Sequence, residues 1–286
     1  MRSKERRVLS DDLPKENPWQ DDRLGYRPFA ERLAKVIRAL PAPNGYAIGL
    51  HGKWGSGKST AINFVKAFVK KYNDEADSRE ESINIVDFRP WIISGHQDLV
   101  AGFFKVLFES IGKRPSFLKR QMNRLMFVGR ATADPLIDAV ATVAIAIDPT
   151  GGTATKALTT VAKKSAATAI DRFLAEPSLQ AAYKKLRDEL KQSGKRFLVT
   201  IDDLDRLDDT EIRTIMQMVK TVGSLPNVIY LLAYDRDVVW PVLDGDRKGG
   251  PKFAEKIVQQ ELELPRPSKD ALLGMLDEEI SSSMRK

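Results

Sequence analysis

Apolar residues occur in two patterns that alternate along most of this chain. In one pattern they form short continuous runs, which are typical of strands buried on both faces. These runs lie at residues 46–50, 83–88, 196–201 and 227–235. In the other pattern they recur every three or four positions, as on one face of a helix. These segments lie at residues 30–40, 60–69, 98–112, 179–190 and 209–221. Strands alternating with helices predict an α/β fold, with a mostly parallel sheet between two layers of helices in a three-layer αβα core.

The helix predicted before the first strand carries an apolar stripe. The stripe consists of Leu33, Val36, Ile37 and Leu40, and packing against the sheet would explain it. The chain before this helix is polar over residues 1–20, which predicts a disordered or extended arm.

A glycine-rich segment connects the strand at 46–50 to the helix at 60–69. Residues 52–59 match the pattern G-x-x-x-x-G-K-[ST] of the phosphate-binding P-loop, Walker A. Backbone N–H groups of such a loop cradle phosphates, the lysine reaches the β- and γ-phosphates, and the following hydroxyl is a ligand of Mg²⁺. The following helix also directs its positive N-terminal end at the phosphates. The predicted nucleotide-binding residues are Gly52, Trp54, Gly55, Ser56, Gly57, Lys58, Ser59 and Thr60. The helix at 30–40 could lie close to the adenine side of this nucleotide site, and packing against the sheet explains its stripe equally well.

Two carboxylates end the strand predicted at 196–201. In a P-loop protein an apolar strand followed by acids is typical of the Walker B motif, in which Asp202 would join Ser59 around Mg²⁺. Asp203 would orient the water that attacks the γ-phosphate. The alternative for an isolated acidic pair is a turn or a helix cap. An acid directly after the metal-binding aspartate favours hydrolysis over transfer of the phosphoryl group to a metabolite.

Further polar residues are candidates for the same site. Asp235 follows the strand at 227–235, where it would sense the γ-phosphate as a catalytic residue or cap a helix beginning near Asp237. Arg206, Arg236 and Lys256 are candidates for a cation that stabilises the transition state, and each has a surface ion pair as its alternative.

The region between the two Walker motifs differs from the rest in composition. Residues 117–175 are rich in Ala and Thr, and their longest apolar run, 139–147, is bounded by Asp138 and Asp148. A membrane-spanning helix needs about 20 apolar residues, so we favour a helical insert in water over a membrane-associated hairpin. The predicted organisation is thus a P-loop half at 21–115, an Ala-rich helical insert at 116–190 and a Walker B half at 191–265.

Composition limits the cofactors and suggests partners. The chain has no cysteine and only two histidines, which leaves Mg²⁺, with its oxygen ligands, as the expected metal. The net charge is +7, and residues 111–133 carry six basic side chains (Lys113, Arg114, Lys119, Arg120, Arg124 and Arg130). That segment could contact nucleic acid or anionic lipid, or be a solvated helix face. The first residues are charged without an apolar core behind them, so we expect no secretory signal and a cytoplasmic protein.

Several motifs together resemble the KAP family of P-loop NTPases, which includes a neuronal membrane scaffold and plasmid-borne phage-exclusion proteins. The resemblance rests on D-R-L-G-Y at 22–26, the Trp-containing P-loop, F-R-P-W at 88–91, I-D-D-L-D-R at 201–206, L-L-A-Y-D-R at 231–236 and F-A-E-K-I-V-Q at 253–259. It implies ATP as the nucleotide and a helical lid beginning at 266–286. Family members often carry membrane-spanning helices between the Walker motifs, and the weakly apolar insert of this chain departs from that.

The leading hypothesis from these motifs is an ATP-hydrolysing switch. The resemblance implies a role in anti-phage defence or plasmid or phage exclusion, in a homo-oligomer or a multi-subunit defence complex. Two alternatives remain. A nucleic-acid-stimulated ATPase would use the basic segment, and a membrane-associated NTPase scaffold would use residues 117–175.

Overall fold

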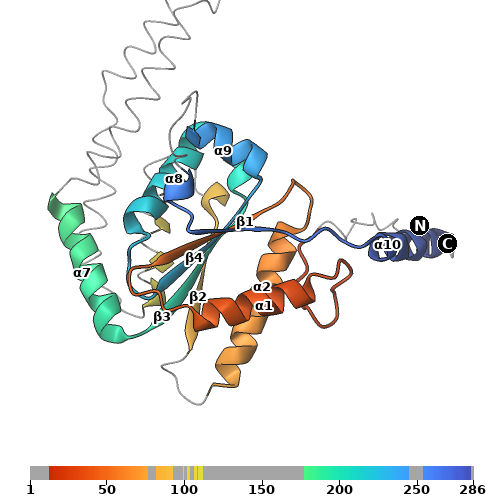
Figure 1. Ribbon diagram of the computed structural model, residues 1–286, viewed down its shortest axis with the longest axis horizontal. Helices are drawn as coiled ribbons and strands as arrows, with labels where there is room; N and C mark the ends of the chain where they lie inside the picture. Colours follow the sequence, from red (N-terminus) through yellow and green to blue (C-terminus); the bar gives the residue numbers. More distant parts are fainter. Residues whose placement is uncertain are drawn as a thin grey trace, which may run out of the picture.

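The fold is built around one parallel sheet of five strands (Figure 1). The computed structural model describes residues 13–76, 82–92, 177–244 and 254–284, with single positions between 99 and 111. The strands are β1 (Tyr46–His51), β2 (Ile83–Phe88), β3 (Arg196–Ile201), β4 (Val228–Tyr234) and β5 (Gln260–Glu263). Their order in the sheet is β2-β3-β4-β1-β5, and every pair is parallel. Because β4 lies between β1 and β3, the residue after β4 emerges between the P-loop and the acidic pair.

Helices cover both faces of this sheet (Figure 1). They are α1 (Arg27–Ala39), α2 (Lys58–Asp74), α7 (Pro177–Ser193), α8 (Asp209–Val222), α9 (Arg236–Asp244) and α10 (Lys269–Met284). Buried residues of α1 and α2 belong to one apolar cluster, and those of α7, α8 and α9 belong to a second. α10 projects away from these layers (Figure 1). The predicted three-layer αβα class and the mostly parallel sheet are therefore confirmed.

Alternation along the strands produces the two apolar clusters. In β4, Tyr230 and Leu232 belong to the cluster with α8 and α9, whereas Ile229 and Leu231 belong to the cluster with α2. Successive side chains of a strand point to opposite faces, and a strand covered on both faces therefore needs a continuous apolar run. This is why the runs in the sequence predicted the strands closely, and β2 and β3 have the predicted bounds.

One residue of the stripe predicted for the first helix is on the wrong face. Leu33 and Ile37 are buried as predicted, but Val36 is 52% exposed. The buried face of α1 is completed by the small residues Ala30 and Ala34, which the predicted stripe of large apolar side chains did not include. Leu40 lies just beyond the helix, as its C-cap.

Part of the N-terminal arm lies against α2. The backbone N–H of Lys15 donates to Oγ1 of Thr60 at 3.2 Å, and Nδ2 of Asn63 donates to the carbonyl of Lys15 at 3.2 Å. The ring of Trp19 lies 5.3 Å from that of Phe68. The stretch from residue 13 to 20 is therefore tied to the P-loop helix.

The predicted insert and its alternatives fall mostly outside the described residues. Residues 112–176, which include the basic segment and the Ala-rich run, are not described. At the end of that region α7 packs Leu186 and Leu190 into the core beside Phe197. Leu99, Phe103, Leu107 and Ile111 of the helix predicted at 98–112 are buried in the same cluster. Within the described residues, no helix is both long and apolar enough to cross a membrane.

Arg196, at the start of β3, caps the end of α1. Its guanidinium donates to the carbonyls of Arg38 at 2.6 Å, Ile37 at 3.0 Å and Leu40 at 2.8 Å. The last carbonyls of a helix lack partners within the helix and carry its negative end. One arginine therefore satisfies three of them and joins the first helix to a central strand.

Replacing Arg196 with methionine should destabilise the fold without touching the P-loop. Three partly buried carbonyl acceptors would lose a charged donor, which costs about 2–3 kcal/mol of unfolding free energy. Urea unfolding followed by circular dichroism measures the loss. Lys195→Met, at the exposed neighbouring position, is the matched control and should leave the midpoint unchanged. A midpoint equal to that of the parental protein in both variants would contradict this capping role.

Candidate functional site

The P-loop occupies the predicted place between β1 and α2, at the carboxyl edge of the sheet. Gly55 and Gly57 have positive φ angles of 76° and 87°, a conformation that glycine adopts without strain. A Cβ on Gly57 would lie 2.9 Å from Cε2 of Tyr26. The hydroxyl of Tyr26 donates to the carbonyl of Ser56. Tyr26, which precedes α1, therefore holds the outer side of the loop.

Lys58 points into the loop rather than into solvent. Its side chain is 6% exposed, and Nζ donates to the carbonyls of Gly52 at 2.9 Å and Lys53 at 3.2 Å. Nζ also lies 3.6 Å from Oδ2 of Asp205. The loop thus holds a buried cation at the point where a phosphate-binding lysine is expected.

Asp202 lies beside the P-loop helix, close to Ser59. It follows β3, its carboxylate interacts with the side chain of Ser59, and Oδ1 accepts from the backbone N–H of Asp203 at 2.8 Å. Burial raises the pKa of Asp202 above its ordinary value, with Asp203 adding a smaller like-charge effect. The structure therefore brings together the two residues predicted as metal ligands.

These two oxygen donors fit Mg²⁺. Carboxylate and hydroxyl oxygens suit this metal, which usually completes its shell with water and nucleotide phosphates. In the described part of the chain, no group of three or more His, Cys, Asp or Glu side chains could hold a metal ion. A metal at Ser59 and Asp202 would accordingly take its other ligands from phosphate and water.

Neutralising Asp202 should stabilise the nucleotide-free protein at neutral pH. Because burial raises its folded-state pKa, the fold favours the protonated form, and stability falls as pH rises from the unfolded-state pKa through the folded one. Asp202→Asn removes that penalty and should raise the melting temperature by roughly 2 °C. Differential scanning fluorimetry at pH 7.5 checks this, with Asp74→Asn at the exposed end of α2 as control. A lower melting temperature for Asp202→Asn would show that its charge supports the fold.

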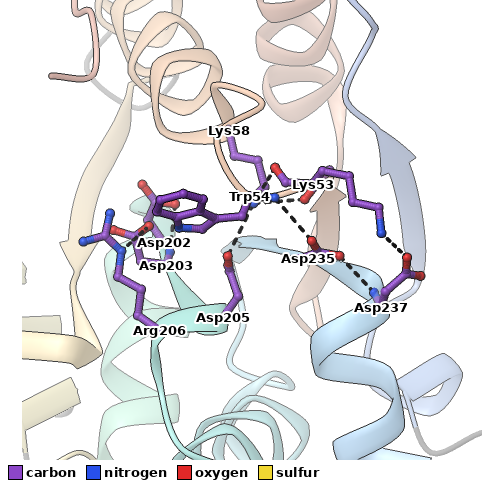
Figure 2. Close-up of polar contacts among 10 residues, drawn as sticks. Lys53, Trp54, Lys58, Asp202, Asp203, Asp205, Arg206, Asp235 and Asp237 are labelled. Carbon is purple, nitrogen blue, oxygen red and sulfur yellow. Dashed lines mark hydrogen bonds and ion pairs between the residues drawn. The ribbon is translucent and has the colours of Figure 1, made fainter. Parts of the chain in front are cut away.

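Asp203 is held by an arginine three residues later. It adopts a left-handed conformation with φ 60°, and Oδ1 lies 3.0 Å from Nε of Arg206. The guanidinium of Arg206 lies 5.7 Å from the ring centroid of Trp91. Arg206 is thus the one of the three candidate cations that the structure pairs with the acidic motif (Figure 2). Arg236 instead lies over Trp240 and pairs with Glu261, and Lys256 is exposed.

Asp235 connects the P-loop to α9. Its Oδ1 accepts from the backbone N–H of Asp237 at 3.0 Å, which makes it the cap of the helix. Its Oδ2 accepts from the backbone N–H of Trp54 at 3.2 Å. The capping alternative is therefore present, together with a contact to the P-loop that the sequence did not predict (Figure 2). Its role as a sensor stays a prediction.

Two further polar features of the site were missed from the sequence. Lys53 of the P-loop pairs with Asp237 at the start of α9, and Asp205 faces Lys58. Asp205 lies on the 3-10 turn Leu204–Arg206, which carries it back toward the sheet edge. Asp205 is the third acid after β3, and this position could have identified it as a residue of the site. In the sequence it was included only as part of the I-D-D-L-D-R motif.

A cavity of about 330 Å³ opens beside the P-loop on the side of β5. It is lined by P-loop residues, by the start of α9, by Tyr26 and by the chain that leaves β5. The lining residues are Tyr26, His51, Gly52, Lys53, Ser56, Asp235, Arg236, Asp237, Glu263, Leu264, Pro265, Arg266 and Pro267. The site thus has a hollow next to the phosphate loop, on the side away from Asp202.

The parallel sheet and the P-loop at its carboxyl edge define a P-loop NTPase. The family profile described as the KAP family P-loop domain matches residues 26–286. The chain belongs to the KAP family, and its fold implies nucleotide binding. The resemblance predicted from the motifs is confirmed.

The chain is similar to one curated protein and to the two solved structures described here. The phage T7 exclusion protein of Escherichia coli strain K12 is 24% identical over 268 residues, covering 86% of this chain. The chain spans 34% of the length of that relative. The ORC2 protein of Aeropyrum pernix has 13% identity and a TM-score of 0.45, covering 94% of this chain and 53% of that structure. PCH-2 of C. elegans has 10% identity and a TM-score of 0.35, covering 96% and 50%.

Proposed function

We propose that this chain binds ATP with Mg²⁺ and hydrolyses the γ-phosphate. The observation that carries the proposal is that the side chain of Ser59 interacts with the carboxylate of Asp202 beside the buried Lys58. It joins the Walker A and Walker B motifs, which lie far apart in the sequence, at one edge of the sheet.

Each residue then has a role that follows from its place. Lys58 would bind the terminal phosphates, for which it is already buried and charged. Ser59 and Asp202 would hold Mg²⁺, which when bound neutralises charge on the phosphates. Asp203, one residue further, would accept a hydrogen bond from the attacking water and orient it. The cavity between Tyr26 and Pro265 is where we place the nucleoside.

Hydrolysis in this site would drive a switch in phage exclusion. The support is membership of the KAP family together with the similarity to the phage T7 exclusion protein. We further propose that the chain acts in the cytoplasm, in a homo-oligomer or a multi-subunit defence complex. No observation on the described residues supports the nucleic-acid or the membrane alternative.

The test is a measurement of phosphate release by the purified protein. With ATP and Mg²⁺ we expect steady turnover, and with excess EDTA we expect none, because the metal is needed to neutralise the phosphates. Binding of a fluorescent ATP analogue is measured in parallel. A protein that binds no nucleotide would refute the proposal, and one that binds without turnover would restrict it to binding.

A further inference from the structure

One carboxylate at the phosphate site has no place in the roles described so far. The side chain of Asp205 is only 3% exposed. Its Oδ2 lies 3.6 Å from Nζ of Lys58, and its Oδ1 is buried and makes no hydrogen bond within the described residues. A buried carboxylate is costly unless it is paired and hydrogen-bonded. The burial of Asp205 with one carboxylate oxygen lacking a hydrogen bond therefore needs an explanation.

The ion pair between Asp205 and Lys58 satisfies neither side chain fully. At 3.6 Å the contact with Lys58 is an ion pair and too long for a good hydrogen bond. The ammonium of Lys58 instead donates its hydrogen bonds to the carbonyls of Gly52 and Lys53. The ammonium is thus shared between the loop and Asp205, and it can be withdrawn from Asp205 without loss of a short hydrogen bond.

A triphosphate in this site would compete with Asp205 for the same lysine. Asp205 follows the same strand end as Asp202 and Asp203, and its carboxylate faces Lys58 (Figure 2). Its negative charge therefore lies on the side that we propose for the terminal phosphate. Two like charges that share one buried cation repel each other strongly at low dielectric. A diphosphate lacks the terminal group and would feel this repulsion less.

We propose that Asp205 is a positioning residue that orients Lys58 before nucleotide binds and weakens triphosphate binding by competing for this lysine. The inference rests on the proposed nucleotide site and adds to it an electrostatic repulsion that weakens binding of the triphosphate. Asp205 then lowers the preference of the site for a triphosphate over a diphosphate.

The test compares affinities for two nucleotides in variants of the full chain. Isothermal titration calorimetry, with Mg²⁺ present and salt held constant, uses a slowly hydrolysed ATP analogue and ADP. Asp205→Asn removes the charge at the same volume and should lower the Kd of the ATP analogue about tenfold. The Kd of ADP should change by less than about threefold. Asp205→Glu keeps the charge and should keep the ATP analogue near its parental affinity.

The matched control is Asp74→Asn. Asp74 is exposed at the other end of α2, roughly 24 Å from Lys58 along a helix of 17 residues. It undergoes the same chemical change and should alter neither Kd.

The outcomes separate this inference from the proposed function. If the parental protein binds neither nucleotide, the proposed function fails. If it binds both while Asp205→Asn binds the ATP analogue no more tightly, or gains equally for ADP, Asp205 has only a structural role and the inference is overturned. If Asp205→Asn does not fold, Asp205→Ser removes the same charge and is judged by the same criteria.

Discussion

Replacing Lys58 with alanine should abolish nucleotide binding. In the structure its ammonium is buried between two P-loop carbonyls and Asp205, where a charge-assisted contact to phosphate is strong. Removing one partner of a buried charge pair costs about 2–5 kcal/mol. We therefore expect a loss of affinity of about thirtyfold to five-thousandfold. Titration with a fluorescent ATP analogue measures it.

The same change has a cost to folding that must be separated from binding. Without Lys58, Asp205 becomes an unpaired buried charge, which is strongly destabilising. The double variant Lys58→Ala with Asp205→Asn removes that charge and should recover most of the stability while nucleotide binding stays lost. Lys70→Ala, at an exposed position on the same helix, is the control. A Lys58→Ala protein that is folded and binds the analogue with parental affinity would refute the phosphate-binding role.

The elements around the site could be predicted because their sequence signals are local. β1 and β3 are continuous apolar runs that need no knowledge of distant residues. The P-loop is defined by glycines whose positive φ angles are needed at fixed positions. Each of these features depends on a few consecutive residues, so the pattern and the structure agree.

The contacts within the site could not be predicted because they depend on sheet order. The position of β4 between β1 and β3 brings Asp235 against the backbone of Trp54, 181 positions earlier in the chain. The 3-10 turn after β3 sends Asp205 to Lys58 and leaves Arg206 on Asp203. Residues on a short turn give no periodic pattern in the sequence. The contacts of Asp205 with Lys58 and of Arg206 with Asp203 could therefore be identified only from the structure.

Replacing Asp203 with asparagine should preserve nucleotide binding and stop turnover. Asn keeps the size of the side chain and tolerates the left-handed backbone at φ 60°, where alanine would add strain. It cannot accept a proton or polarise water as a carboxylate does, and loss of a general base costs about 10²–10⁴ in rate.

Phosphate release under saturating ATP measures that loss, and the fluorescent analogue checks that its Kd stays within about twofold of the parental value. Asp74→Asn should match the parental protein in both assays. Because Arg206 pairs with Asp203, the variant also frees this arginine. Arg206→Gln alone therefore shows whether loss of the cation contributes. If Asp203→Asn hydrolysed ATP at the parental rate, another group would have to orient the water, and Asp203 would serve only to hold Arg206 over Trp91.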